Sequence, residues 1–159
     1  TTTPMFKTLR FAVALCALAT PLVAQAAAKT GVTIPGQNPN PTLSPGIRVG
    51  DMLYASGQLG MRRDAPDSTI EGQTRQSLEN TKAVLEAGGT SMANVVKCTV
   101  FLVKASDFQG MNRVYREYFP KDPPARSTVV VAALVSAAAV VEIECMAVIP
   151  KTQGPGTGE

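Results

Sequence analysis

One arginine in the chain stands in an unusual setting. Arg126 follows two prolines and precedes two hydroxyl residues in the segment PPARST, residues 123–128. The prolines restrict the backbone at the entry to this segment. A guanidinium held on rigid backbone can bind both oxygens of a carboxylate in one plane. The alternative is a surface arginine at the start of a strand, which the local pattern alone favours.

Two carboxylates alternate with apolar residues in the segment VEIEC, where Glu142 and Glu144 are two residues apart. In a strand they would share one face, about 7 Å apart. Two carboxylates on a packed strand face are unusual, because an unpaired buried charge is costly. A functional explanation is that one of them activates water as a general base. Ordinary ion pairing at a partly hydrated interface explains the pattern equally well. Asn112 is a third polar candidate that could bind a ligand, although capping of a loop is the simpler interpretation.

The composition excludes several kinds of site. The 159 residues contain no histidine, which removes Ser-His-Asp and Cys-His nucleophile systems and histidine-containing zinc sites. The sequence also contains no phosphate loop, dinucleotide fingerprint or CxxC motif. Short motifs alone therefore identify no activity.

Two helices are predicted to position these residues. The first begins at Ser68, which forms a capping-box pattern with Glu71, and runs to about Ala87. The second is capped by Ser106 and stopped by Pro120. The inward stripes are Thr74, Leu78, Thr81 and Leu85 in the first helix, and Phe108, Met111, Tyr115 and Tyr118 in the second.

Apolar, β-branched runs predict five strands, the first two joined by a hairpin turn at Gly50-Asp51. The order ββαβαββ implies a mixed sheet with both helices on one face, an α+β sandwich. Since two helices cover only one face, we expect self-association to cover the other. The strands are expected at 47–49, 52–56, 95–103, 126–134 and 140–148, with a loop at 60–68.

The N-terminal segment has the pattern of a secretory signal peptide. Lys7 and Arg10 precede an apolar run at 11–24 and small residues near position 26. The run is too short for a membrane span of about 20 residues; the alternative is an amphipathic N-terminal helix. We interpret 1–26 as a cloning remnant plus this signal, and predict a periplasmic or secreted protein. The remaining divisions are an extended arm at 27–45, one domain at 46–150 and a disordered tail at 151–159.

Removal of residues 1–26 would leave a nearly neutral domain. The formal charge of +3 falls to +1 without Lys7 and Arg10, so a cationic surface for nucleic acid is not expected. Cys98 and Cys145 could pair in an exported protein. Each lies within an apolar run, however, where a buried free thiol is the simpler interpretation.

The order of the motifs resembles the RidA (YjgF) family of enamine/imine deaminases, also labelled endoribonuclease L-PSP. The resemblance runs from about Ile47 to Val148. It implies a chorismate-mutase-like fold and a homotrimer whose sheets face a central barrel, with three clefts between subunits and no metal or cofactor. The segments that carry it are SGQ at 56–58, QTRQSLENTKAVLEAGG from Gln73, VVKCTVFL, DFQGMNRVYREYF, PARSTV and VEIE.

Within this resemblance, Arg126 binds a substrate carboxylate and Glu142 positions the attacking water. The implied reaction is hydrolysis of 2-imino or enamine acids, such as 2-aminoacrylate, to 2-keto acids and ammonia. Leu43 stands where deaminating members commonly carry an aromatic residue. The turn at 135–139 is one residue longer than is usual in the family. If the extra residue lies in the turn, Glu142 is the pocket carboxylate; if the strand slips, Glu144 takes that position. The residues implied to line the pocket are Ser56, Gly57, Asn112, Ser127, Thr128 and Leu43.

Two other functions compete with this deaminase. The first is a trimeric module that uses Arg126 to bind small carboxylates without turnover, which Leu43 favours. The second is the older ribonuclease label, which the lack of histidine and of a basic groove disfavours.

Overall fold

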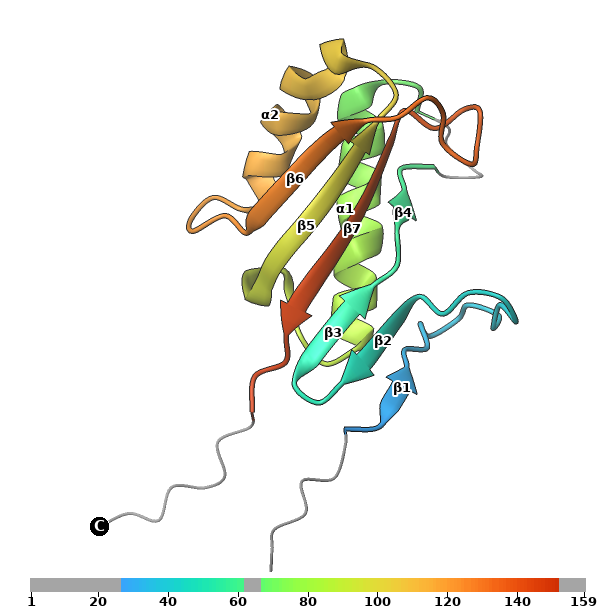
Figure 1. Ribbon diagram of the computed structural model, residues 1–159, viewed down its shortest axis with the longest axis vertical. Coiled ribbons are helices and arrows are strands. Elements are labelled where there is room, and N and C mark those ends of the chain that lie inside the picture. Colours follow the sequence, from blue (N-terminus) through green and yellow to red (C-terminus); the bar gives the residue numbers. More distant parts are fainter. Residues whose placement is uncertain (1–26, 62–66, 152–159) are drawn as a thin grey trace, which may run out of the picture.

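A computed structural model describes residues 27–61 and 67–151 and places both of their α-helices behind one mixed sheet (Figure 1). The predicted signal segment 1–26 and nearly all of the predicted tail lie outside the described residues. Within the described residues, neither helix combines the length and the apolar character needed to cross a membrane. The elements are β1 (Lys29–Gly31), β2 (Gly46–Val49), β3 (Met52–Ala55), β4 (Gln58–Leu59), α1 (Ile70–Ala87), β5 (Val95–Leu102), α2 (Phe108–Tyr118), β6 (Ala125–Val130) and β7 (Val141–Val148), with 3₁₀ turns at Met92–Asn94 and Ala105–Asp107.

The sheet has the strand order β1-β2-β3-β7-β5-β6, with β4 also paired to β7. Strands β5 and β6 are parallel, because α2 crosses over between them, and the other pairs are antiparallel. The predicted ββαβαββ order and the α+β class are therefore confirmed. The sequence pattern missed β1, an exposed KTG segment within the predicted arm, and β4, which has only two residues.

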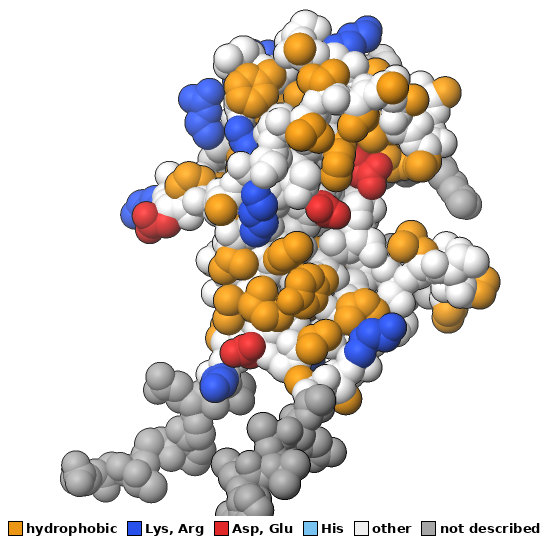
Figure 2. All heavy atoms as spheres, viewed as in Figure 1, with side chains coloured by type: hydrophobic (Ala, Val, Ile, Leu, Met, Phe, Trp, Pro, Cys, Tyr) orange, Lys and Arg blue, Asp and Glu red, His pale blue; other side chains and the backbone are white. Residues whose placement is uncertain are grey.

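The two faces of the sheet differ in character. The inner face packs on the helices through fully buried residues such as Val100, Val141 and Ile143. The opposite face, called the open face below, exposes apolar side chains, and Figure 2 shows them gathered below a group of acidic side chains. The most exposed of those we assign to it by strand register are Tyr54, Val129, Met146 and Val148, each 37–43% exposed.

The helix starts differ from the predicted ones. α1 is capped by Thr69, whose hydroxyl accepts a hydrogen bond from the N–H of Gly72 at 3.1 Å. The prediction of Ser68 was one residue early, because the Asp67 carboxylate binds Thr69 and holds it in the cap position. The prediction of a Ser106 cap for α2 was wrong, since a 3₁₀ turn leads directly into that helix without a side-chain cap. The inward stripe of α1 is confirmed, with all four residues fully buried.

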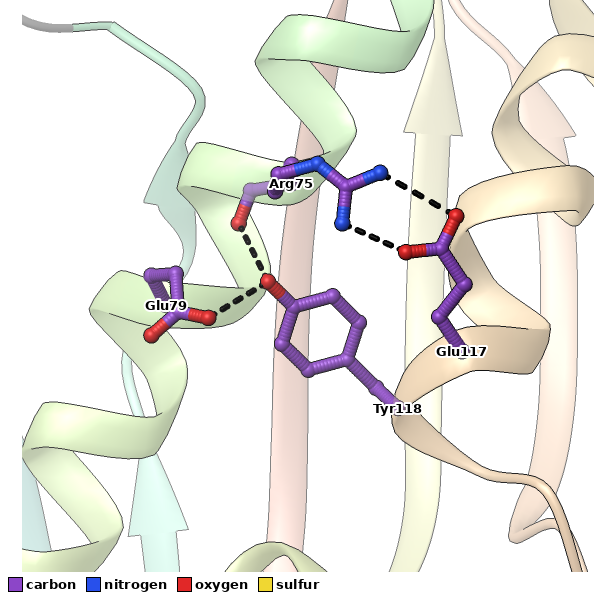
Figure 3. Close-up of polar contacts among 4 residues, drawn as sticks. All are labelled: Arg75, Glu79, Glu117 and Tyr118. Carbon is purple, nitrogen blue, oxygen red and sulfur yellow. Dashed lines mark hydrogen bonds and ion pairs between the residues drawn. The ribbon is translucent and has the colours of Figure 1, made fainter.

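The outer surfaces of the helices are joined by polar contacts (Figure 3). The Arg75 guanidinium binds both carboxylate oxygens of Glu117, at 2.5 and 3.1 Å. The Tyr118 hydroxyl donates to Glu79 at 2.6 Å. These contacts fix α2 against α1 on the side away from the sheet.

One strand boundary and one prediction about the cysteines need correction. β6 ends at Val130 rather than at Leu134, because its partner β5 ends at Leu102 and the last bond between them runs from Val131. The interpretation of Cys98 and Cys145 as free thiols was wrong. The register of β5 and β7 sets these two residues directly opposite each other, and they form a buried disulfide.

Candidate functional site

Arg126 lies on the edge strand β6 and points toward the helices. It is in register with buried Cys98 on parallel β5, so both side chains leave the sheet on its inner face. Its guanidinium carbon lies 4.5 Å from the centre of the Tyr115 ring and 5.9 Å from that of Phe108. One guanidinium nitrogen points to the sulfur of Met111 at 3.8 Å. The aromatic rings of α2 thus hold the arginine by cation–π contact.

The guanidinium retains its capacity for an anion. Among the described residues, Arg126 forms no ion pair with a carboxylate, whereas Arg75 and Arg113 each bind a glutamate. Rings contact the face of a guanidinium and leave the N–H groups in its plane free to donate. This arrangement suits a planar carboxylate ligand.

Two of the predicted residues accompany Arg126. Thr128 is two residues further along β6 and faces the same side. Asn112 lies inside α2, four residues after Phe108 and three before Tyr115, and so shares their face of the helix. Arg126, Asn112 and Thr128 are called the Arg126 group below.

Tyr115 supports this group as an aromatic surface. Burial raises the pKa of its hydroxyl to about 12, against the opposing effect of the nearby Arg126 charge. The hydroxyl therefore stays protonated at neutral pH. Its oxygen is buried and finds no hydrogen-bond partner among the described residues.

The sheet separates Ser127 from the Arg126 group. Ser127 points to the open face, where its hydroxyl accepts a hydrogen bond from Lys97 Nζ at 2.8 Å. Successive side chains of a strand point to opposite faces. The sequence neighbours Arg126 and Ser127 therefore cannot line the same pocket within one chain.

Glu142 and Glu144 both point to the open face, as their spacing predicted. They lie opposite Phe101 and Thr99 on β5. Glu144 borders a small hollow of about 160 Å³ together with Lys97. Glu142 instead packs on the backbone of Gly57, where an added Cβ would lie 1.9 Å from its carboxylate oxygen.

The segment next to Glu142 carries three further predicted residues. Ser56 donates its hydroxyl to the carbonyl oxygen of Ser44 at 2.7 Å, which fixes the loop before β2. Leu43, in that loop, is 53% exposed. A hollow of about 650 Å³ opens here, bordered among others by Leu43, Ser44, Gly57, Gln58, Met61 and Asn80. Glu142, Gly57, Ser56 and Leu43 are called the Glu142 group below.

The predicted site thus falls into two groups that one chain does not bring together. β6 and β7 are separated by β5, which places them about 10 Å apart in the sheet. Arg126 and Glu142 also lie on opposite faces of that sheet. A small molecule bound to both residues would need two copies of the chain.

Some supporting residues were missed from the sequence. Phe108 and Tyr115 were predicted only as core residues. Gln73 was named only as the first residue of a family motif, and no role was predicted for it. The sequence did carry a signal for Phe108 and Tyr115: the two aromatic residues are seven positions apart, on the helix that precedes the PPAR segment. No group of three His, Cys, Asp or Glu residues that could hold a metal ion occurs in the described part of the chain.

Comparison with known proteins identifies similar chains. The family model named Endoribonuclease L-PSP matches residues 36–149. A 2-iminobutanoate/2-iminopropanoate deaminase of Dermatophagoides farinae is 41% identical over 109 residues, which cover 67% of this chain and 84% of the relative. A RutC family protein of Saccharolobus solfataricus is 46% identical over 94 residues, 57% of this chain and 75% of the relative. The crystal structure of the E. coli YjgF gene product superposes with a TM-score of 0.63 at 36% identity, covering 67% of this chain and 87% of that one.

Proposed function

Since the chain belongs to the RidA (YjgF) family, the family of the Endoribonuclease L-PSP model, we propose that it hydrolyses reactive 2-imino and enamine acids to 2-keto acids and ammonia. Similar proteins are named deaminases of such imines. The observation that carries the proposal is Arg126, a guanidinium supported by two aromatic rings at a sheet edge. A guanidinium held in this way fits the carboxylate that every such substrate carries.

The proposed reaction needs only water as co-reactant. An enamine such as 2-aminoacrylate takes up a proton at its terminal carbon and becomes 2-iminopropanoate. Water adds to the imine carbon as the C=N double bond becomes single, and Glu142 accepts a proton from that water. Glu142 passes this proton to the nitrogen, and the C–N bond breaks as the new hydroxyl group gives up its own proton and becomes the C=O of pyruvate, so that pyruvate and ammonia leave.

The proposed site forms between chains. Arg126 of one chain and Glu142 of another would meet in a homotrimer whose open faces turn inward. The exposed apolar residues Tyr54, Val129, Met146 and Val148 support this assembly, because contiguous apolar surface on one sheet face favours association. Three such clefts would each bind one small 2-imino acid and release one 2-keto acid.

The N-terminal pattern and the disulfide support export as a further part of the proposal. Disulfides persist in the periplasm and outside cells but are rare in the reducing cytosol, and Cys98 and Cys145 are bonded. Expression of the full chain in a bacterium should give periplasmic protein that begins near residue 27. N-terminal sequencing tests this, and cytosolic protein that retains Lys7 would contradict it.

The central experiment measures keto-acid release from 2-imino acids generated in place by an amino-acid oxidase. Wild-type protein should accelerate release over buffer, and Arg126→Ala should lower kcat/KM about a thousandfold, the loss expected for an unpaired substrate carboxylate. The matched control is Arg48→Ala, since Arg48 is an exposed strand arginine remote from both groups. No acceleration by a folded wild-type protein would exclude the deaminase.

The second candidate function is a carboxylate-binding module without turnover. Leu43 favours it, because an apolar side chain at the mouth of the hollow cannot donate a hydrogen bond to a substrate. Calorimetry with 2-oxobutanoate separates the two functions. Binding that Arg126→Ala abolishes, in a protein that releases no keto acid, would support the module.

A further inference from the structure

Gln73 is a glutamine with only 2% of its surface exposed, in the first turn of α1. Its side-chain nitrogen donates to the carbonyl oxygens of Asp67 at 3.0 Å and Ala138 at 2.8 Å. Its side-chain oxygen accepts from the backbone N–H of Val140 at 2.8 Å. If the amide were flipped, its oxygen would face two carbonyl oxygens and its NH₂ group would face the N–H of Val140. The three bonds therefore determine the orientation of the amide.

These bonds hold the end of an irregular segment. Residues 131–140 contain no helix or strand, and β7 begins directly after them. Both backbone groups of Val140 are satisfied, the N–H by Gln73 and the carbonyl oxygen by the N–H of Val103 at 3.2 Å. Two residues later, Glu142 packs on Gly57. The Gln73 amide is thus the last side-chain anchor before the proposed general base.

The rest of β7 is fixed by other means. Its later residues pair with both β3 and β5, and Cys145 is bonded to Cys98. At the start of the strand, Val141 and Glu142 pair with the end of β5 on one side, and β4 contributes only two paired residues on the other. Loss of the Gln73 anchor would therefore loosen the N-terminal end of β7 and leave its centre in place.

We propose that Gln73 is a positioning residue that holds Glu142 in place through Val140. The inference rests on the proposed function, in which Glu142 activates water. Gln73 itself would touch neither substrate nor water. Its loss should lower the rate of the chemical step without affecting carboxylate binding by Arg126.

The test compares wild type with Gln73→Met, which keeps the side-chain length but removes all three hydrogen bonds. We expect kcat to fall about tenfold to hundredfold, the usual cost of misplacing a catalytic group by about 1 Å. KM should change less than about twofold, because Arg126 lies on a different strand and face. Hydrogen exchange measured by NMR should show faster exchange of the Val140 amide, while that of Val100 in β5 stays protected.

Two variants serve as controls. Thr81→Val removes a buried hydroxyl that bonds only within α1, to the carbonyl oxygen of Ser77, and should retain wild-type kcat. Gln73→Glu keeps the acceptor for Val140 but turns a carboxylate toward two carbonyl oxygens. Its activity relative to wild type should recover as the pH falls, since a protonated carboxyl can donate again.

The outcomes separate this inference from the proposed function. An unchanged kcat in Gln73→Met, or an equal loss in Thr81→Val, would overturn the positioning role. If wild type hydrolyses no imine, the proposed function fails, and hydrogen exchange alone tests whether Gln73 anchors Val140. An exchange rate of the Val140 amide that is the same in wild type and Gln73→Met would then overturn the anchor as well.

Discussion

The Arg126 group and the Glu142 group are built by different means. Side chains hold Arg126: two aromatic rings of α2 lie against the guanidinium on the inner face of the sheet. Backbone holds Glu142, which packs on Gly57 at the open face. The packing that holds Arg126 is therefore complete within one chain, whereas Glu142 lies on the face proposed to meet other chains.

Under the proposed function, this difference means that each group needs the other. In the proposed reaction the Arg126 group would bind the carboxylate but supply no base, and Tyr115 beside it keeps its proton because burial raises its pKa to about 12. The Glu142 group, as far as the structure describes it, would supply a carboxylate base but no cation for the substrate. Association through the open face would supply each group with the other.

The largest expected effect comes from mixing two inactive variants. Arg126→Ala and Glu142→Ala should each lose about a thousandfold in kcat/KM. In the proposed trimer, each site takes Arg126 from one chain and Glu142 from another. When equal amounts of the two variants associate at random, about a quarter of the sites receive both intact residues. The mixed trimers should therefore regain about a quarter of wild-type activity. Keto-acid release after joint refolding measures this.

The matched control refolds each variant alone and mixes the assembled proteins without exchange of chains. Activity should then stay at the level of the single variants. An inactive refolded mixture of confirmed hetero-oligomers would mean that both groups act within one chain, contrary to their placement on opposite faces of the sheet.

The disulfide is the covalent link between the two groups, and its loss gives the next largest effect. Cys98 lies beside Arg126 in the sheet, and Cys145 lies on the strand of Glu142. The bond closes a sequence separation of 47 residues, so its reduction should lower the free energy of unfolding by about 4 kcal/mol. Urea titration with and without dithiothreitol measures the change.

A double variant with both cysteines replaced by alanine should show no response to dithiothreitol. Mass spectrometry of the oxidised wild type should give two hydrogens fewer than the reduced form. Free thiols at both positions in protein purified without reductant would contradict the bond.

Gly57→Ala tests the backbone support of Glu142. The added methyl would displace the carboxylate oxygen that now lies 1.9 Å from its position. Because the displaced atom is the end of a flexible side chain, we expect a folded protein whose kcat falls about tenfold to hundredfold. Gly31→Ala is the matched control, since its nearest neighbour would be a serine oxygen at 3.7 Å. Equal kinetics for the two variants would exclude a role of this contact.

The elements were predictable because their signals are local. The stripe of α1 repeats at helical spacing, and the hairpin turn at Gly50 adopts a φ of 60° that glycine permits at little cost. The order of strands and helices then limits the sheet to few topologies. Arg126 and Glu142 were likewise visible as charged residues in apolar strands.

The relations between elements were not predictable from local pattern. The pairing of Cys98 with Cys145 depends on the register of two strands that are far apart in the sequence. Strand alternation separates Arg126 from Ser127, but which of the two faces α2 depends on how β6 packs against the helices. The anchor at Gln73 depends on a turn 65 residues away, and a single buried glutamine gives no signal of its partner.

The smallest effects are expected on the outer helix surface, away from both groups (Figure 3). The hydrogen bond from Arg75 holds the pKa of Glu117 below its usual value, so this pair stabilises the fold at neutral pH and the contribution is lost as the pH falls through that lowered pKa. Burial and Glu79 raise the pKa of Tyr118 to about 12, so its contribution is complete below about pH 10 and is lost as the pH rises through the raised value. Glu117→Gln should flatten the acid limb of stability against pH and Tyr118→Phe the alkaline limb, both measured as urea midpoints. Neither should alter kcat, and a changed kcat in either would show that this surface is coupled to the Arg126 group through α2.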